Sequence, residues 1–352
     1  RRRGSGTGAL FRSLEIAKIN LPALTTPAAG GLFMNRRKVS RAVIKEAAAL
    51  IRAGGVVAFP TETVYGLGAD GLNPEACARI FEIKGRPRFD PLILHECSVA
   101  RARKLFSKVP AAALELMKKF WPGPLTLVLP KARFVPDIVT AGLPTVAVRV
   151  PANPHALALI KAAGRPIAAP SANSFGRLSP TSAAHVKKQL GGRPDLILDG
   201  GKTRIGVEST IITFEKGRPV LLRPGGLPLE EIEKAAGRAS SPGKSGKERP
   251  PAPGCLKRHY APGARLRLIA PGRSVKAGPR AAYLAFSKKP AGEFLAVRVL
   301  SRRGDLREAA ANLFSALHKL ESSGAAVIYA ERVPAQGLGR AIMDRLNRGS
   351  RR

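Results

Sequence analysis

The sequence is poor in acidic residues, cysteine and aromatic residues, and it lacks a long hydrophobic run. Asp and Glu number 24 against 60 Lys and Arg in 352 residues, which leaves a formal net charge of +36. This charge favours polyanionic partners such as RNA or nucleotides, and it carries no information about the fold. No apolar run approaches the roughly 18 residues of a membrane-spanning helix, so we expect no membrane association of that kind.

Cysteine is rare, and its pattern excludes two classes of small stabilised domain. Cys77, Cys97 and Cys255 are odd in number, lie far apart and form no C-x-x-C pair. Neither a disulfide framework nor a zinc knuckle is therefore supported. The five histidines also show no metal-binding spacing, so we expect a cytoplasmic protein without a dedicated protein metal site.

Hydrophobic residues make up 44% of the chain, which is enough for a globular protein with a core. Strand and helix patterns alternate over residues 45–236 and predict a mixed α/β domain. Residues 240–254 are rich in Ser, Pro, Gly and Lys without hydrophobic periodicity, which is typical of a linker. Beyond the linker, four strand patterns and an amphipathic helix over residues 305–320 predict a second, small and partly parallel α/β domain.

The first 33 residues are basic, show no periodicity and contain one acid, Glu15. Two interpretations stay open, an organellar presequence and an upstream extension with Met34 as the natural start. Residues 1–40 carry eight Lys or Arg and one acid, and residues 238–280 carry eleven and one. The predicted plan is a basic, disordered N-terminal extension (1–38), a first α/β domain (39–237), a linker or lid (238–264) and a small C-terminal α/β domain (265–352).

Polar side chains gather where predicted buried strands end, which is where open α/β sheets bind ligands. Residues 59–68, F-P-T-E-T-V-Y-G-L-G, place hydroxyls, a carboxylate and a phenol at such an end. Lys84, Arg86 and Arg88 form a basic cluster at a predicted helix C-terminus, suited to a phosphate chain or to a solvated helix end. Arg149 ends the strand pattern of residues 145–148, where it could clamp a carboxylate bidentately or lie on the surface.

Together these segments resemble the threonylcarbamoyl-AMP synthase family, with its YrdC-like domain, in the two-domain form. The resemblance extends from about residue 39 to residue 347. It implies a twisted, mixed open sheet with helices, followed by a smaller Rossmann-like α/β domain. The motifs that carry it are the K-x-R…S-x-N tetrad (Lys84, Arg86, Ser171, Asn173), the segment 59–68, P-L-x-x-H at 91–95, G-V-E-S-T at 206–210, L-R-P-G at 222–225 and H-Y-A-P at 259–262.

The resemblance implies a nucleotidyltransferase that joins L-threonine, bicarbonate and ATP, with Mg²⁺, into threonylcarbamoyl-AMP and releases pyrophosphate. A separate tRNA threonylcarbamoyl transferase would then use the product to modify the adenosine beside the anticodon. N-carboxythreonine is an anion that attacks the α-phosphorus of another anion. Positioning and charge neutralisation should therefore dominate the catalysis.

The family pattern also implies three sets of site residues on this sequence. In two places the sequence departs from that pattern. Asp90 stands where the family usually has Asn, which leaves that contact open unless a metal intervenes, and Cys255 stands where it usually has Met. The three sets are catalytic, Lys84, Arg86, Ser171 and Asn173; L-threonine-binding, Thr63, His95, Arg149, the backbone of Ala169 and Ser209; and ATP-binding, Arg86, Asp90, Thr145, Ser171, Ser179, Arg223 and Tyr260.

Two other functions stay open at this point. A YrdC-like module that only binds RNA would account for the charge, but aromatic residues make up only 5% of the chain and are not interleaved with the basic runs. We therefore expect weak, salt-dependent RNA binding at most. A hydrolase-maturation type of carbamoyl adenylation normally brings zinc-finger modules, and the sequence has no cysteine cluster.

Residues 257–260 add two cations, a His and a Tyr to the linker, which predicts a lid.

Overall fold

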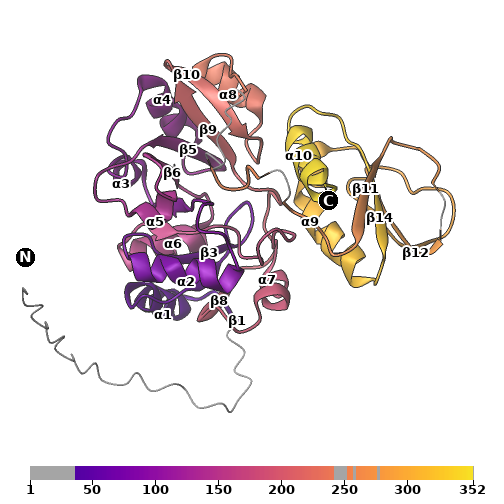
Figure 1. The fold of residues 1–352 in the computed structure, drawn as a ribbon, viewed down its shortest axis with the longest axis horizontal. Helices are drawn as coiled ribbons and strands as arrows, with labels where there is room; N and C mark the ends of the chain where they lie inside the picture. The colour runs from indigo at the N-terminus through magenta and orange to yellow at the C-terminus, as the bar shows by residue number, and fades with distance from the viewer. Residues whose placement is uncertain (1–35, 242–251, 257–258, 276–277, 352) are drawn as a thin grey trace, which may run out of the picture. The chain divides into compact units, whose positions relative to one another are not determined.

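The structure, a computed structural model, describes residues 36–241, 252–256, 259–275 and 278–351. These residues form a ten-stranded sheet and a four-stranded sheet, each with its own helices (Figure 1). Most of the predicted N-terminal extension and much of the predicted linker, including residues 257 and 258, lie outside the described residues. Within them, no helix is both long enough and apolar enough to cross a membrane.

The large sheet is mixed: four of its neighbouring strand pairs are parallel and five are antiparallel. This agrees with the twisted mixed open sheet that the sequence predicts. In spatial order its strands are β1 (Arg36–Lys38), β8 (Leu196–Asp199), β2 (Val57–Phe59), β3 (Gly66–Asp70), β7 (Ile167–Ala168), β4 (Ile93–His95), β6 (Thr145–Arg149), β5 (Leu125–Pro130), β9 (Thr210–Glu215) and β10 (Arg218–Arg223).

Eight helices accompany this sheet in the described residues, and their ends follow local capping signals. In α2, the side chain of Asn73 accepts a hydrogen bond from the Ala76 amide, and Pro74 occupies the first helical position. Gly85 then ends α2 in a left-handed conformation with φ 60°. The eight are α1 (Arg41–Arg52), α2 (Pro74–Lys84), α3 (Val99–Arg103), α4 (Ala111–Phe120), α5 (Asp137–Thr140), α6 (Pro154–Ala163), α7 (Ala183–Leu190) and α8 (Leu229–Ala236).

Helices cover both faces of the sheet around β2 but not around β4 and β6. Side chains alternate along β2, so Val57 and Phe59 share a core with α1 and α6, whereas Ala58 shares one with α2. Further along the sheet, on the same face as Phe59, a small apolar cluster contains Ile93 of β4, other strand residues and Ala252 of the linker. Among the described residues, no helix contributes to this cluster. This part of the sheet face is therefore available for a ligand.

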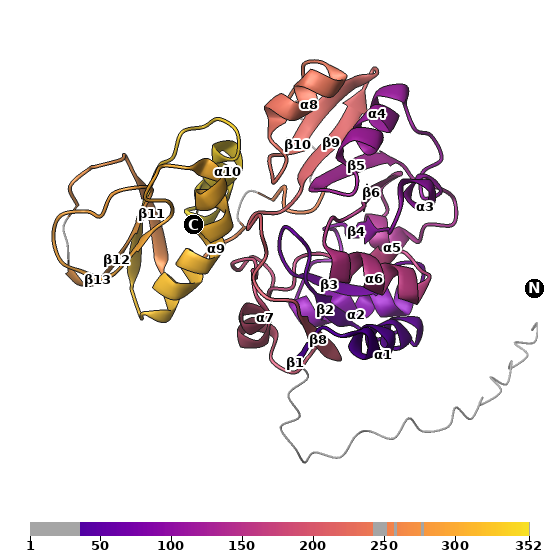
Figure 2. The same ribbon diagram turned by 180° about the vertical axis from the view of Figure 1, so that it is seen from behind.

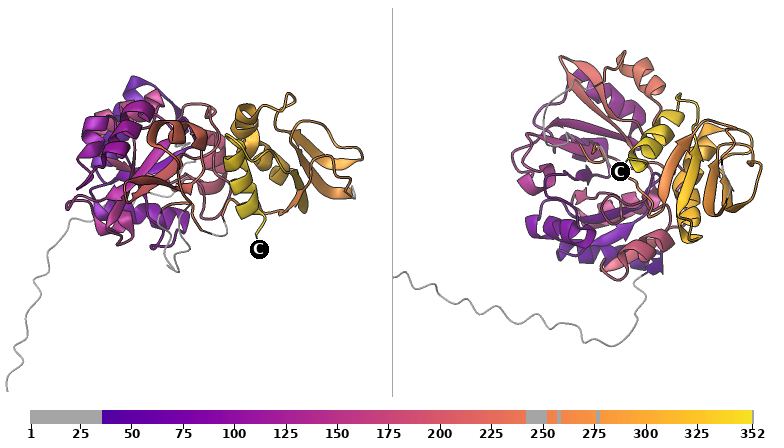
Figure 3. Two further views of the ribbon diagram at one scale, coloured as in Figure 1. Left: turned by 90° about the horizontal axis from the view of Figure 1, so that it is seen from above. Right: turned by 45° about the vertical axis from the view of Figure 1, so that its right-hand side comes forward.

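The small sheet has all three of its strand pairs parallel, where the sequence predicted a partly parallel arrangement. Its strands, in order, are β11 (Arg265–Ile269), β14 (Val327–Glu331), β12 (Gly278–Ala285) and β13 (Phe294–Val299). The helices α9 (Leu306–Ser322) and α10 (Gly339–Gly349) share one core with one face of this sheet (Figures 2 and 3). The second unit is thus small and α/β, as predicted, and its four-stranded sheet is fully parallel.

Several predicted elements differ from the structure at their ends, and some were missed. The first helix begins at Arg41, ahead of the residue 45 at which the alternating patterns were predicted to start, because the Ser40 side chain accepts a hydrogen bond from the Val43 amide and caps the helix there. Strand β3 was not predicted because it contains two glycines, and glycine is generally depleted from strands. Gly68 is required there, since a Cβ would lie 2.6 Å from both Phe59 and Ile167 side-chain atoms. Strand β10 and helix α10 were also not predicted.

Candidate active site

A pocket lies on the part of the large sheet's face that α1 and α6 leave uncovered. Its walls come from the segment after β2, Arg86 after α2, the ends of β4, β6 and β10, the segment after β7, residues 208–209 before β9, and linker residues 253–254 and 259–260. Because β4 and β6 are parallel, their carboxyl ends meet at one edge of the sheet, where His95 and Arg149 are paired in register. The pocket therefore collects side chains from segments that are distant in the sequence.

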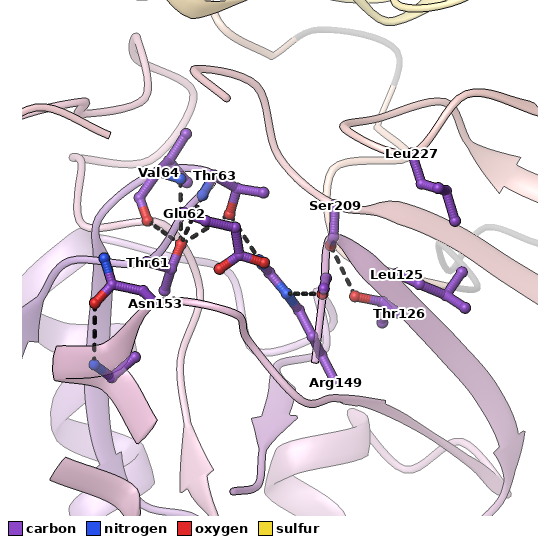
Figure 4. Close-up of polar contacts among 12 residues, drawn as sticks. Thr61, Glu62, Thr63, Val64, Leu125, Thr126, Arg149, Asn153, Ser209 and Leu227 are labelled. Atoms are coloured by element: carbon purple, nitrogen blue, oxygen red, sulfur yellow. Dashed lines mark hydrogen bonds and ion pairs between the residues drawn. The ribbon is translucent and has the colours of Figure 1, made fainter. Parts of the chain in front are cut away.

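Arg149 is the buried cation at one end of the pocket, and only 3% of its surface is exposed. Its Nη1 donates to the Thr63 hydroxyl at 2.9 Å, its Nε donates to the Gly123 carbonyl at 3.2 Å, and its Nη2 donates to Glu62. Figure 4 shows the segment with Glu62 and Thr63 on one side of the guanidinium, and Ser209 on the other. Two guanidinium N–H groups, one on each Nη, remain beyond these contacts, which suits a bidentate carboxylate.

Glu62 is a functional candidate that the site prediction left out. It is 4% exposed, and Oε1 accepts from Arg149 while Oε2 has no hydrogen-bond partner among the described residues. A buried carboxylate beside a guanidinium fixes the rotamer of the guanidinium and offsets its charge. The signal in the sequence was the position of Glu62 next to Thr63, since neighbouring residues of a turn reach the same side chain.

His95 lies on the same face of the sheet as Arg149 and is buried against the edge of the Phe59 ring. Burial, together with the nearby Arg149 charge, lowers the pKa of His95 to about 3. The imidazole is therefore neutral near pH 7. It offers hydrogen bonds to a substrate rather than a positive charge.

Arg223 holds the segment that leads into β9. Its Nε and Nη2 donate to the Ser209 carbonyl at 3.2 and 2.9 Å, and Nη2 also donates to the Ser209 hydroxyl at 3.2 Å. The same hydroxyl lies 2.7 Å from the Thr126 hydroxyl. Nη1 donates to the Pro253 carbonyl at 3.0 Å, so Arg223 also ties the linker to the pocket wall.

Lys84 holds the segment after β7 rather than facing the pocket. Its ammonium donates to the carbonyls of Ser171 and Asn173, and the side chain is buried. Burial and the adjacent Arg86 charge lower the pKa of Lys84 well below its usual value. Ser171 itself lines the pocket, whereas the Asn173 amide donates to the carbonyls of Ser174 and Arg177. Within the tetrad, Lys84 and Asn173 therefore shape the loop that presents Ser171.

Arg86 lines the pocket and is paired with Asp90. The Arg86 Nε donates to the Asp90 carbonyl at 3.0 Å, and Nη2 donates to the Pro91 carbonyl at 2.7 Å. Nη2 also lies 2.9 Å from Oδ2 of the Asp90 carboxylate. Asp90 is fully buried behind Arg86 and does not itself line the pocket.

Glu208 connects the pocket to the C-terminal α/β unit. Its Oε2 accepts from Nε of Arg345 on α10 at 2.8 Å, and its Oε1 accepts from the Ser179 hydroxyl. Burial alone would raise the pKa of Glu208, but Arg345 and Arg223 and the two hydrogen bonds lower it to about 2. Ser179 thus reaches the pocket through Glu208. Neither Glu208 nor Arg345 was predicted, because the contact depends on how α10 packs.

Linker residues 253–254 and 259–260 contribute to the walls of the pocket in this conformation. Tyr260 is 2% exposed, its ring lies 5.1 Å from the Arg345 guanidinium, and its hydroxyl has no hydrogen-bond partner among the described residues. A Cβ on Gly254, which has φ 73°, would lie 2.6 Å from that hydroxyl, so only glycine allows the close approach. The pocket volume is only about 40 Å³, whereas small-molecule sites usually span about 300–1,000 Å³.

The structure brings most of the predicted site residues to this one pocket. Thr145 lies at the other end of β6 from Arg149, on the same face and about 13 Å along the strand. Asp90, Ser179, Lys84 and Asn173 stand behind the wall, as described above. The predicted residues that line the pocket are Thr63, Arg86, His95, Arg149, Ala169, Ser171, Ser209, Arg223 and Tyr260.

The pocket and the sheet define the class of protein. Three buried guanidiniums, those of Arg86, Arg149 and Arg223, line one pocket together with hydroxyls and a neutral imidazole. Such a site suits two anionic substrates at once, one with a carboxylate and one with phosphates. The fold and the site thus define an α/β enzyme that transfers a group from one anionic substrate to another.

Comparison with known proteins specifies the family. Residues 49–225 match the Sua5_yciO_yrdC family, whose description reads "Telomere recombination", and residues 227–350 match the family "Threonylcarbamoyl-AMP synthase, C-terminal domain". Threonylcarbamoyl-AMP synthase of Pyrococcus abyssi is 48% identical over 326 residues, 90% of this chain and 96% of that protein. The Bacillus subtilis enzyme of the same name is 45% identical over 316 residues, 86% and 91% of the two chains.

The solved structure of P. abyssi Sua5 complexed with L-threonine matches with a TM-score of 0.82 at 45% identity, covering 90% of this chain and 96% of that one. The chain therefore belongs to the threonylcarbamoyl-AMP synthase family, in the form that includes the family's C-terminal domain. Its activity is that of an ATP-using nucleotidyltransferase that makes threonylcarbamoyl-AMP for the threonylcarbamoyl modification of tRNA adenosine.

Proposed function

We propose that the pocket condenses L-threonine, bicarbonate and ATP into threonylcarbamoyl-AMP and pyrophosphate. One observation carries the proposal: a single pocket contains the buried guanidinium of Arg149 at one end and those of Arg86 and Arg223 elsewhere in its walls. An amino-acid carboxylate and a triphosphate both need such partners where water is excluded. The L-threonine complex of the P. abyssi relative supports the amino-acid half of the proposal.

The threonine end of the pocket is assigned from Arg149 outward. The two remaining Arg149 N–H groups take the carboxylate, while Thr63 and Glu62 keep the guanidinium in place. Neutral His95, the Ser209 hydroxyl and the backbone of Ala169 complete this end. A small, hydroxyl-lined site of this kind selects a small polar side chain over a large apolar one.

The chemistry proceeds in two steps. The threonine amine first attacks bicarbonate, water leaves, and the N-carboxythreonine anion forms. One carbamate oxygen then attacks the α-phosphorus of ATP, the bond from that phosphorus to the β-phosphate oxygen breaks, and pyrophosphate leaves. Arg86 and Arg223 stabilise the negative charge that develops on the transferred and leaving groups.

The nucleotide is assigned to the rest of the pocket and to β6. Arg86, Ser171 and Arg223 face the phosphates, and Thr145 lies further along the pocket face of β6. Lys84, Asn173 and Ser179 act behind the wall by positioning Ser171 and Glu208. The described residues hold no cluster of three His, Cys, Asp or Glu side chains suited to a metal. We assign Mg²⁺ to the nucleotide as part of the MgATP substrate, which suits an ion held largely by phosphates and water.

The linker acts as a lid in this proposal. The pocket of about 40 Å³ is too small for MgATP and threonine, so residues 253–256 and 259–260 must move outward before the substrates enter. Closure then places Tyr260 over the substrates and excludes water from a labile carbamate. In the same scheme residues 39–237 form the catalytic domain, residues 238–264 the linker, and residues 265–352 the C-terminal domain.

The product is proposed to pass to a separate tRNA threonylcarbamoyl transferase in the cytoplasm. Contact with RNA would then be weak and governed by salt, since the reaction itself uses no RNA. The test is pyrophosphate release from MgATP in the presence of bicarbonate and each amino acid in turn. Release that depends on both threonine and bicarbonate is the expected result, and release that is the same with threonine and with valine would refute the assignment.

A further inference from the structure

Asp90 places a buried carboxyl group directly behind Arg86, at the nucleotide end of the pocket. Its side chain is 0% exposed, and Oδ2 lies 2.9 Å from Nη2 of Arg86. Neither carboxylate oxygen has a hydrogen bond among the described residues. The carboxylate is thus held by charge alone, in contrast to Glu208, whose two oxygens both accept hydrogen bonds.

The groups that face this carboxylate are mostly cations. Lys84 of α2, Arg86 after α2 and Arg223 of β10 interact electrostatically with the Asp90 carboxylate. The Cys255 thiol of the linker also interacts electrostatically with Asp90. Burial raises the pKa of Asp90, while the three cations oppose that shift. The pKa of Cys255 is raised to about 11, mainly by burial, so the thiol stays neutral near pH 7.

Arg86 is the residue that an anion in the pocket and Asp90 would share. Its Nε and Nη2 already donate to the carbonyls of Asp90 and Pro91, which leaves Nη1 for a ligand in the pocket. These two carbonyl contacts hold the guanidinium in place without the carboxylate. The carboxylate therefore adds charge compensation to an Arg86 that the backbone already orients.

We propose that Asp90 is an internal competitor of the ATP triphosphate at Arg86 and sets the affinity of this enzyme for ATP. The proposal rests on the nucleotide site assigned above. A phosphate that reaches Arg86 meets a guanidinium already neutralised from behind, so the attraction is smaller than the cations of the site would otherwise provide. Asp90 thus weakens ground-state binding of ATP, and removing its charge should tighten that binding.

The substitution Asp90→Asn tests this directly, because it removes the charge and keeps the shape. With a Mg²⁺ complex of α,β-methylene-ATP as the probe, calorimetry should show an affinity about tenfold higher for the variant, which corresponds to about 1.4 kcal/mol. The KM for ATP should fall in parallel, and the KM for L-threonine should stay unchanged. Asp137→Asn is the matched control, since Asp137 pairs with Lys131 on the surface and is 82% exposed.

The pH dependence supplies a second readout that a structural role would not produce. Protonated Asp90 resembles the amide of the variant, so the two proteins should bind the probe with similar affinity at acidic pH and diverge as the pH rises. The ratio of the two affinities at each pH does not depend on the protonation of the probe itself, because the same probe binds both proteins. Weaker probe binding by Asp90→Asn would identify Asp90 as an anchor of Arg86, and a higher Mg²⁺ requirement would identify a metal contact; either result, or equal affinity at all pH values, overturns the proposal.

The proposal and the assigned function fail separately in these experiments. If the wild-type protein makes no threonylcarbamoyl-AMP, the proposed function fails whatever the binding data show. If the wild type is active and binds the probe with the same affinity as Asp90→Asn, the competition proposal alone fails.

Discussion

Replacing Arg149 with alanine should raise the KM for L-threonine much more than the KM for ATP. The substrate carboxylate would lose a charge-assisted bidentate partner in a buried site, where Arg149 is 3% exposed. Such a loss costs about 2–4 kcal/mol, which corresponds to about 30- to 900-fold in KM. The KM for ATP should change by less than about threefold, because Arg86 and Arg223 remain in place.

The structure adds a complication, since Arg149→Ala also leaves Glu62 buried without its cation. Breaking a buried ion pair on one side costs about 3–5 kcal/mol of stability. The double variant Glu62→Gln/Arg149→Met removes both charges and separates the loss of binding from the loss of stability. Arg101→Ala is the matched control, because it also leaves a buried carboxylate, that of Glu96, outside the pocket.

Initial rates of pyrophosphate release, with threonine and ATP varied separately, give the two KM values for each variant. Thermal unfolding of the same samples shows whether they remain folded. An equal rise of both KM values in the folded double variant would show that Arg149 is not the threonine clamp. An unchanged KM for threonine would show the same.

Three further predictions follow from the linker, the N-terminal residues and Glu208. Tyr260→Ala should reduce synthesis without unfolding the catalytic domain, and ATP with threonine should slow tryptic cleavage after residues 257 and 258; equal cleavage with unchanged activity would reduce the linker to a connector. Deletion of residues 1–33 should lower nonspecific RNA binding in filter assays and leave synthesis intact, and lost synthesis would place these residues in the fold. The pKa of Glu208 is lowered from 4.5 to about 2, so the stability that this group adds is present above about pH 4.5 and is lost as the pH falls toward 2. The advantage of the wild type over Glu208→Gln in urea unfolding should therefore shrink over that interval, and a constant difference would contradict the ion pair with Arg345.

The sequence predicted the fold best where local signals are strong. The amphipathic helix predicted over residues 305–320 is α9 (Leu306–Ser322), and the strand pattern of residues 145–148 is β6 (Thr145–Arg149). Strand β3 was missed because Gly66 and Gly68 interrupt the alternation of apolar and polar side chains that predicts a strand. Glycine is present there because the Phe59 ring packs closely against the backbone of β3. Helix α10 was missed because Arg345, a fully buried cation, interrupts its apolar pattern.

The residues of the candidate site were predicted from motifs, but the contacts between their side chains were not. Arg149 and Thr63 could be placed together from the family resemblance, but the contact between Arg149 and the Glu62 carboxylate could not. Such contacts depend on side-chain rotamers and on strands brought together by the sheet, which one sequence does not encode locally. The same holds for Arg345, which reaches Glu208 across 137 residues.

The most direct test of the central claim is mass spectrometry of the reaction product. The protein is incubated with MgATP, L-threonine and ¹³C-bicarbonate, and the nucleotide products and pyrophosphate are measured together. We expect a threonylcarbamoyl-AMP that carries the ¹³C label, with pyrophosphate formed in equal amount and neither product formed when threonine is omitted. Pyrophosphate release without a labelled adenylate, or an equal rate without threonine, would contradict it.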